Sequence, residues 1–141
     1  MSTLRNCAVT LGMAAAVVLL LVPAPRSVSA ESWPTESECG KLEDPSAVTK
    51  GWCTTINRRK GNCLACHTIS VQPWPATLPE GGNLAPPLVS MKARFPDQEK
   101  LFKQIWDPTS LNDHSRMPPF GKHKLLSEQE IRSIIEFLHT I

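Results

Sequence analysis

Two cysteines and a histidine stand at a spacing that can hold a metal cofactor. Residues Cys63-Leu64-Ala65-Cys66-His67 read C-x-x-C-H. Two thiols at this spacing can add to the two vinyl groups of a haem, and the adjacent histidine can then ligate the iron. A redox dithiol would need a surrounding strand and helix alternation, and a zinc site would need a second Cys or His pair close by; neither is present in the sequence. The motif therefore predicts one c-type haem, attached through Cys63 and Cys66, with His67 as its proximal ligand.

A haem that only carries electrons needs a second axial ligand. The candidates are Met91, Met117, His114, His123 and His139. Met117 is favoured because the two prolines that follow it stiffen its loop, and because a thioether stabilises reduced iron. Met91 falls in an expected helix, where a methionine is more often core packing, and His114 is the runner-up. His139 ends the last expected helix, where a cation suits the helix dipole, and His123 is expected on the surface.

The N-terminus predicts an exported protein. Arg5 precedes an apolar run from Cys7 to Val22, and Val28-Ser29-Ala30 is a small-residue cleavage site. The run has about 16 residues, short of the roughly 20 that a spanning helix needs. We therefore expect residues 1–30 to be a cleaved signal peptide, no membrane span after cleavage, and a periplasmic location.

Removing residues 1–30 changes the charge and leaves four cysteines. The chain has 15 Lys+Arg and 13 Asp+Glu, and Arg5 and Arg26 leave with the signal. The mature chain is then formally neutral, which gives no argument for a nucleic-acid partner. Beyond the two motif cysteines, Cys39 and Cys53 form an even pair in an exported protein, so we expect a disulfide between them.

The remaining pattern predicts an all-α fold. A helix is expected over 45–59, with Asp44 as its N-cap, and shorter helices over 88–94 and 96–106. Ser127 and Glu130 form a capping box that opens the last helix. Residues 68–88 and 109–124 are rich in proline and predict long loops, and residues 31–40 look irregular. The expected organisation is an N-terminal extension over 31–44 and a single domain over 45–141.

Several segments outside the motif resemble a known family. Gly82-Asn83-Leu84-Ala85-Pro86-Pro87-Leu88 and Met117-Pro118-Pro119-Phe120-Gly121 are similar to segments of class I cytochromes c. The segments Arg59-Lys60-Gly61-Asn62-Cys63 and Ile105-Trp106-Asp107-Pro108, together with the Met117 segment, resemble more narrowly SoxX, the monohaem subunit of the SoxAX sulfur-oxidation complex.

That resemblance implies a class I cytochrome c-like fold, thioether attachment through Cys63 and Cys66, and His67 and Met117 as axial ligands. By the same analogy, the Pro86 carbonyl is expected to accept a hydrogen bond from the His67 ring. It also implies three partners: a SoxA-like cytochrome subunit in a heterodimer, the SoxY carrier protein, and a small soluble cytochrome c as electron acceptor.

The implied reaction is an L-cysteine S-thiosulfotransferase reaction that oxidatively links thiosulfate to a SoxY cysteine. Within it, this chain would carry electrons and contribute no catalytic residue. Two alternatives stay open: a free-standing periplasmic electron shuttle, and the cytochrome subunit of another periplasmic oxidoreductase.

Overall fold

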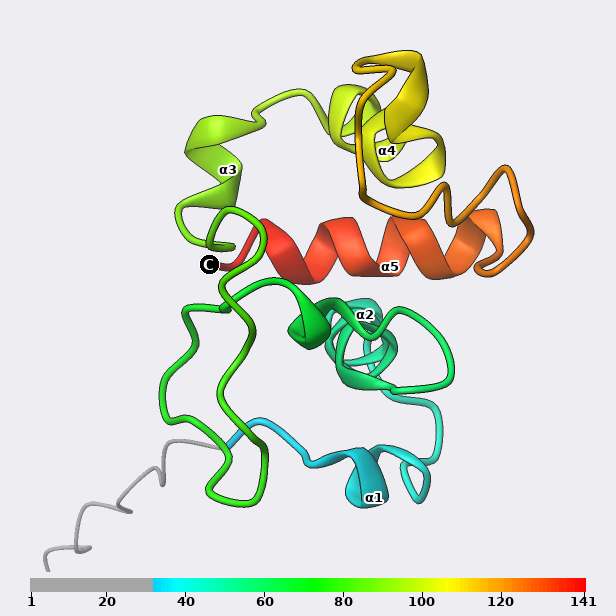
Figure 1. Cartoon of the computed structure of the whole chain (residues 1–141). Coiled ribbons are helices and arrows are strands. Elements are labelled where there is room, and N and C mark those ends of the chain that lie inside the picture. Colours follow the sequence, from blue (N-terminus) through cyan, green and yellow to red (C-terminus); the bar gives the residue numbers. More distant parts are fainter. Residues whose placement is uncertain (1–31) are drawn as a thin grey trace, which may run out of the picture.

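The computed structural model describes residues 32–141, so the predicted signal peptide lies outside the described residues. Helices make up the regular structure of this part, and its only β-type pairing is an isolated parallel bridge between Ile69 and Leu88. The all-α prediction is therefore confirmed. The α-helices are α1 (Glu36–Cys39), α2 (Ala47–Ile56), α3 (Met91–Arg94), α4 (Gln98–Trp106) and α5 (Glu128–Leu138), and the 3-10 turns are η1 (Cys63–Ala65) and η2 (Pro108–Ser110) (Figure 1).

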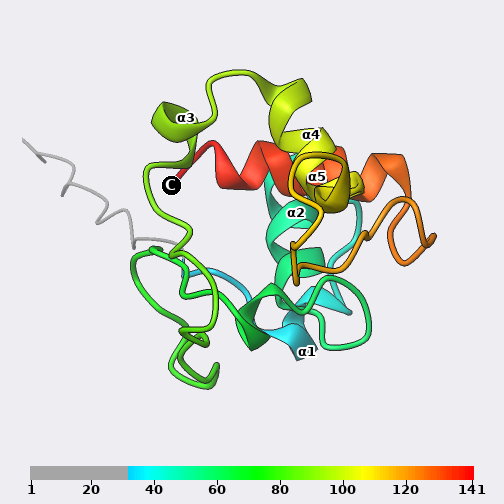
Figure 2. The same cartoon turned by 45° about the horizontal axis from the view of Figure 1, so that its top comes forward.

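The crossing of α2 and α5 is the centre of the molecule (Figure 2). Gly51 of α2 lies directly against α5, because a Cβ atom placed on it would stand 1.9 Å from the Ser133 carbonyl oxygen. Trp52 of α2 and Phe137 of α5 are fully buried beside this crossing, with ring centroids 5.3 Å apart. The absence of a side chain at residue 51 thus lets the two helices approach closely enough to bury these large aromatic groups.

Helix α5 begins as its sequence predicts. The Ser127 hydroxyl accepts from the Glu130 backbone N–H, and the Glu130 carboxylate accepts from the Ser127 N–H, at 3.2 and 2.9 Å. These two bonds satisfy N–H groups that the helix itself leaves unpaired. The Glu130 carboxylate also pairs with Lys60, just before the C-x-x-C-H motif. The helix buries an apolar face against the core, through Ile131, Ile134, Ile135, Phe137 and Leu138.

The start of α2 differs from the prediction. Asp44 has a left-handed backbone, with φ 42°, and pairs with Lys50 at 3.0 Å instead of capping the helix. Ser46 is the N-cap, and its hydroxyl accepts from Thr49 N at 3.2 Å. The helix is shorter than the predicted 45–59, because Asn57 turns to an extended conformation.

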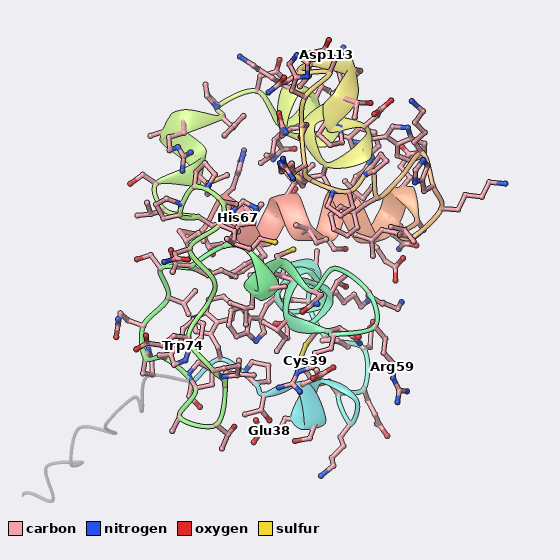
Figure 3. The ribbon with its side chains drawn as sticks, viewed as in Figure 1. Glu38, Cys39, Arg59, His67, Trp74 and Asp113 are labelled. Carbon is pink, nitrogen blue, oxygen red and sulfur yellow. A yellow bond between two sulfur atoms is a disulfide. The ribbon has the colours of Figure 1, made fainter. Side chains whose placement is uncertain are left out.

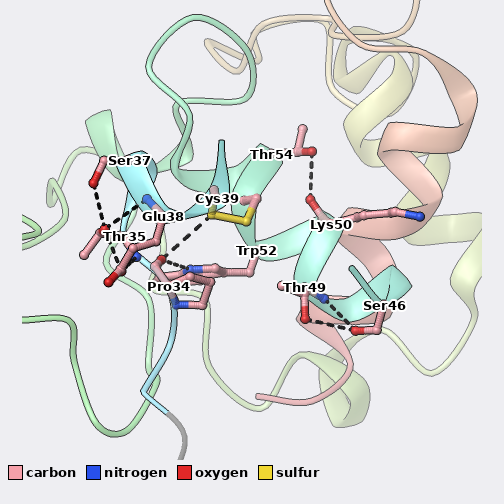
Figure 4. The surroundings of a disulfide bond; sticks show 11 residues. Pro34, Thr35, Ser37, Glu38, Cys39, Ser46, Thr49, Lys50, Trp52 and Thr54 are labelled. Atoms are coloured by element: carbon pink, nitrogen blue, oxygen red, sulfur yellow. Dashed lines mark hydrogen bonds between the residues drawn. A yellow bond between two sulfur atoms is a disulfide. The ribbon is translucent and has the colours of Figure 1, made fainter. Parts of the chain in front are cut away.

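The segment expected to be irregular near the N-terminus contains α1 and is tied to α2 (Figure 4). Cys39 and Cys53 form the expected disulfide, with Cα atoms 5.6 Å apart. The Trp52 indole N–H donates to the Pro34 carbonyl at 2.7 Å, and the Trp33 ring packs 5.2 Å from the Trp52 ring. We call residues 33–39 the N-terminal clasp, because they cover α2 through the disulfide, the hydrogen bond to Pro34 and the contact of the Trp33 and Trp52 rings.

The middle of the chain forms α3 and α4, each shorter than predicted. Asp97 caps α4 by accepting from the N–H groups of Glu99 and Lys100 at 2.9 and 3.4 Å, so Pro96 lies ahead of the helix and not within it. The contact between α4 and α5 includes an ion pair of Glu99 with Arg132 at 2.9 Å. Helix α4 is thereby fixed on α5, with its C-terminal end at the loop that contains Met117.

Candidate haem site

The C-x-x-C-H motif forms a single tight turn. Asn62 has a left-handed backbone, with φ 47°, and opens η1. The His67 N–H donates to the Cys63 carbonyl at 2.9 Å, which closes the turn. Figure 3 places His67 near the middle of the molecule, between the part with α3 and α4 and the part with α2. The turn holds both thiols and the imidazole on one short piece of backbone.

The ring of His67 is oriented by a single hydrogen bond. Its Nδ1 lies 2.6 Å from the Pro86 carbonyl oxygen. A carbonyl can only accept, so Nδ1 must carry the proton and Nε2 must be the nitrogen with a free lone pair. The geometry therefore leaves Nε2 available to a metal and makes the ring a stronger donor.

The loop that carries Pro86 lies directly on the motif. The Gly82 N–H donates to the Leu64 carbonyl at 2.8 Å, and the Ala85 N–H donates to the Cys66 carbonyl at 3.0 Å. A Cβ atom on Gly81 would stand 2.1 Å from the His67 carbonyl oxygen. Only glycine fits so close to this backbone. The loop thus covers the histidine side of the motif.

The two motif cysteines are free thiols in different surroundings. Cys63 is half-buried, and burial raises the pKa of its thiol to about 12, whereas Cys66 is exposed. Fully buried Thr55 lies on the neighbouring helix α2, and its hydroxyl has no hydrogen-bond partner among the described residues. Two unpaired thiols, an imidazole with a free Nε2 and the glycine-lined loop fit a haem attached through both sulfurs.

Met117 lies half-buried against the hydrophobic core, in the loop between η2 and α5. Its N–H donates to the Ser115 hydroxyl at 3.3 Å. Its Sδ lies 4.0 Å from Nε2 of Gln104, a residue of α4. The thioether is thus held at the inner side of the loop rather than in solvent.

The same loop is held at its far end by Trp106. The Trp106 carbonyl accepts from the N–H groups of Gly121 and Lys122, both at 3.1 Å. A Cβ atom on Gly121 would stand 2.1 Å from the Trp106 ring. Asp107 and Lys122 form an ion pair at 2.8 Å. Two of the three segments that carried the narrower resemblance, 105–108 and 117–121, are therefore in direct contact with each other.

The rival ligands lie in less suitable places. The His114 side chain is 92% exposed and stands 3.7 Å from the Asp113 carboxylate at the surface. Met91 is buried in α3, with its Sδ 3.6 Å from the Arg94 guanidinium, and His123 is exposed. His139 caps the C-terminal end of α5, as expected. Its Nε2 is buried and has no partner within the described part of the chain.

Sequence reasoning did not single out Gln104 or the contact of Trp106 with Gly121. A glutamine on a short helix is usually solvated, and nothing in its spacing points to a methionine in a later loop. The sequence marked the segments that contain Trp106 and Gly121 only by their similarity to segments of a known family. Their meaning depends on a long-range contact, which periodicity does not report.

The chain belongs to the cytochrome c family, since the cytochrome c family model matches residues 58–141. It is therefore an electron-transfer protein with covalently bound haem c. An uncharacterized lipoprotein from Aquifex aeolicus (strain VF5) is 33% identical over 81 residues, which are 57% of this chain and 37% of that protein. The chain thus spans little more than a third of that relative's length. None of the helices within residues 32–141 is long and apolar enough to cross a membrane.

Proposed function

We propose that this chain is a monohaem electron carrier in which Cys63 and Cys66 hold the haem and His67 and Met117 ligate the iron. The observation that carries the assignment is the hydrogen bond from His67 Nδ1 to Pro86, because it leaves Nε2 free for iron. The inward position of Met117 supports the second ligand. Both thiols would be consumed by addition across the haem vinyl groups.

The chain's own residues would hold the cofactor without entering the chemistry. The haem, when bound, supplies a one-electron couple. His67 and Met117 would both ligate the iron, which suits the site to electron transfer rather than to substrate binding. The loop over 80–88 and the loop over 115–122 are each hydrogen-bonded to neighbouring backbone, which limits structural change between oxidation states. Such a site moves electrons and needs no catalytic residue.

We further propose that the chain is the SoxX-type subunit of a thiosulfate-oxidising complex. The support is the resemblance over 59–63, 105–108 and 117–121, together with the predicted signal peptide. In the proposed reaction the sulfane sulfur of thiosulfate bonds to the sulfur of a SoxY cysteine, the thiol proton is released, and two electrons leave. A SoxA-like subunit would perform this step. This chain would pass the electrons on to a small soluble cytochrome c.

Co-expression with a SoxA-like protein from the same genome tests this proposal. We expect a stable heterodimer that reduces a soluble cytochrome c when thiosulfate and SoxY are both added, and no turnover by this chain alone. The matched control is the same heterodimer without SoxY. If no heterodimer forms, the result contradicts the SoxX-type role and favours the hypothesis of a free-standing electron shuttle. A heterodimer with a different oxidoreductase would favour the other alternative.

A further inference from the structure

A hollow in the protein surface borders the disulfide of the N-terminal clasp. We propose that the Cys39–Cys53 disulfide is a thiol-exchange site, at which a small thiolate attacks Cys39 Sγ in the folded protein, displaces Cys53 and releases α1 from α2. The site is separate from the candidate haem site, and the inference does not rest on the proposed function. It makes the attachment of the N-terminal clasp reversible by thiol chemistry.

The disulfide is accessible in the folded protein. The hollow has a volume of about 180 Å³, and the two cysteines that border it are half-buried rather than enclosed in the core. Gly40 follows Cys39 at the hollow and adds no side chain that could cover the sulfur atoms. Access is one of the factors that set the rate of thiol–disulfide exchange, and exposed disulfides are the labile ones. A small thiol can therefore reach this bond without unfolding the helices beneath it.

Charge does not select the thiol. The two charged residues that line the hollow are Glu36 and Lys60, which carry opposite charges. Each is also paired outside the hollow, Glu36 with Arg58 at 3.8 Å and Lys60 with Glu130. The hollow thus has no net charge of its own, and the size of the thiol decides whether it reacts.

The exchange step balances without an added oxidant or reductant. The sulfur of the thiolate bonds to Cys39 Sγ, the bond between the two cysteines breaks, and its electron pair leaves with Cys53 Sγ as a thiolate, which is protonated by water. The structure indicates which sulfur is attacked. Cys39 Sγ lies 3.9 Å from the Pro34 carbonyl oxygen, which would disfavour a negative charge on Cys39 (Figure 4). Cys53 is therefore the better leaving group.

Cleavage of the bond would free α1 and the segment after it. None of the four residues of α1 is buried, and residues 40–44 are all exposed. A helix of this length is not stable without a tether. Trp33 and Pro34 would keep their contacts with the Trp52 ring and indole N–H. Exchange should therefore release residues 36–44 and leave the α2–α5 crossing covered.

Mass spectrometry of the haem-loaded protein treated with 2-mercaptoethanol tests the site. After trapping with N-ethylmaleimide in acid, we expect the added thiol on Cys39 and the trapped thiol on Cys53. The exchange rate should rise in proportion to the thiolate concentration and should not change in denaturant too dilute to unfold the protein. Glutathione, a larger thiol, should show a severalfold lower rate when each thiol is compared with its own rate on the unfolded chain.

Tryptic cleavage after Lys41 measures the release of α1. Exchange should raise the cleavage rate in the folded protein to that of the Cys39→Ala, Cys53→Ala double variant, which thiol should not change further. Lys50 lies within α2 and is the internal control, since cleavage there should stay slow.

The results that would overturn the inference are distinct from those that bear on the haem. An exchange rate that rises with denaturant in step with the loss of stability would show that the disulfide reacts only in unfolded molecules. An adduct on Cys53 would overturn the assignment of Cys39 as the attacked sulfur. Cleavage at Lys41 that stays slow after exchange would overturn the release of α1.

Discussion

At the scale of single residues, the direction of one carbonyl controls the candidate site. Pro86 is followed by Pro87, and a residue before proline is restricted to extended conformations. Both ends of this segment are held, since the Ala85 N–H donates to the Cys66 carbonyl at 3.0 Å and the Leu88 N–H donates to the Thr68 carbonyl at 2.8 Å. The Pro86 carbonyl therefore has little freedom to leave Nδ1 of His67. The ring orientation is set before any metal is bound.

Asp107 provides a prediction about pH. Hydrogen bonds from Lys122 and Thr109 hold the pKa of the Asp107 carboxyl below its ordinary value. A lowered pKa means that this carboxylate stabilises the fold fully above about 3.9, the unfolded value, and that the stabilisation is lost as the pH falls through the folded value. Because Lys122 belongs to the Met117 loop, we expect acid to release Met117 from the iron.

Acid titration of the charge-transfer band checks this prediction. Asp107→Asn should lose the band at a higher pH than the unsubstituted protein does. Asp113→Asn, at an exposed position of the same region, is the control. An unchanged acid transition in Asp107→Asn would show that the ion pair does not hold the loop.

At the scale of helices, the α2–α5 crossing should tolerate no added volume. Gly51→Ala would place a methyl group 1.9 Å from the Ser133 carbonyl oxygen and 2.9 Å from Phe137 Cβ, so the helices must separate. Overpacking of this kind typically costs 1–3 kcal/mol, and we expect a loss of about that size. Denaturant unfolding of the haem-loaded protein measures it.

A control for the crossing exists in the N-terminal part of the chain. Gly40→Ala would place its methyl group 3.7 Å from the Ser37 carbonyl oxygen, an ordinary contact, and Gly40 has a helical backbone. This variant should unfold at nearly the same denaturant concentration as the unsubstituted protein. Equal stability of the Gly51 and Gly40 variants would argue against the close crossing.

At the scale of the whole molecule, the N-terminal clasp adds stability to the crossing from outside. The Trp33 ring lies 5.2 Å from both the Trp52 and the Phe137 rings, so the clasp covers residues of α2 and α5 together. The Cys39–Cys53 disulfide holds it there, across a sequence separation of 14. A cross-link of this span limits the unfolded chain more than it changes the folded one.

Removal of the disulfide should therefore destabilise the protein without altering the haem. We expect Cys39→Ala with Cys53→Ala to cost about 3 kcal/mol in denaturant unfolding. The absorption spectrum should stay the same, because neither sulfur is a candidate ligand. A mild thiol reductant should lower the free energy of unfolding of the unsubstituted protein and should not change that of the double variant. If the double variant is as stable as the unsubstituted protein, the disulfide of the N-terminal clasp does not stabilise the fold.

Local sequence signals predicted the parts of the structure that depend on neighbouring residues. The C-x-x-C-H turn, the Ser127 capping box and the loop over 68–88 follow from residue types a few positions apart. The N-cap of α2 was placed wrongly at Asp44, because Ser46 offers an equivalent hydroxyl and Asp44 pairs with Lys50 instead. Competing local signals of similar strength cannot be ranked without the fold.

The contacts around Met117 could not be predicted in the same way. Gln104 and Trp106 contact the loop over 115–122 from helix α4, which itself packs on α5. Helix α1 was also missed, since it is very short and is tied to the chain by the disulfide and by Trp33. Such contacts join segments that are distant in sequence, where spacing carries no information.

The absorption and electron paramagnetic resonance spectra of the purified haem-loaded protein test the central claim most directly. We expect one haem per chain and low-spin iron in both oxidation states. The oxidised protein should show a thioether-to-iron charge-transfer band that Met117→Leu abolishes. High-spin ferric iron in the unsubstituted protein, or a band that survives in Met117→Leu, would contradict the assignment of His67 and Met117 as the two iron ligands.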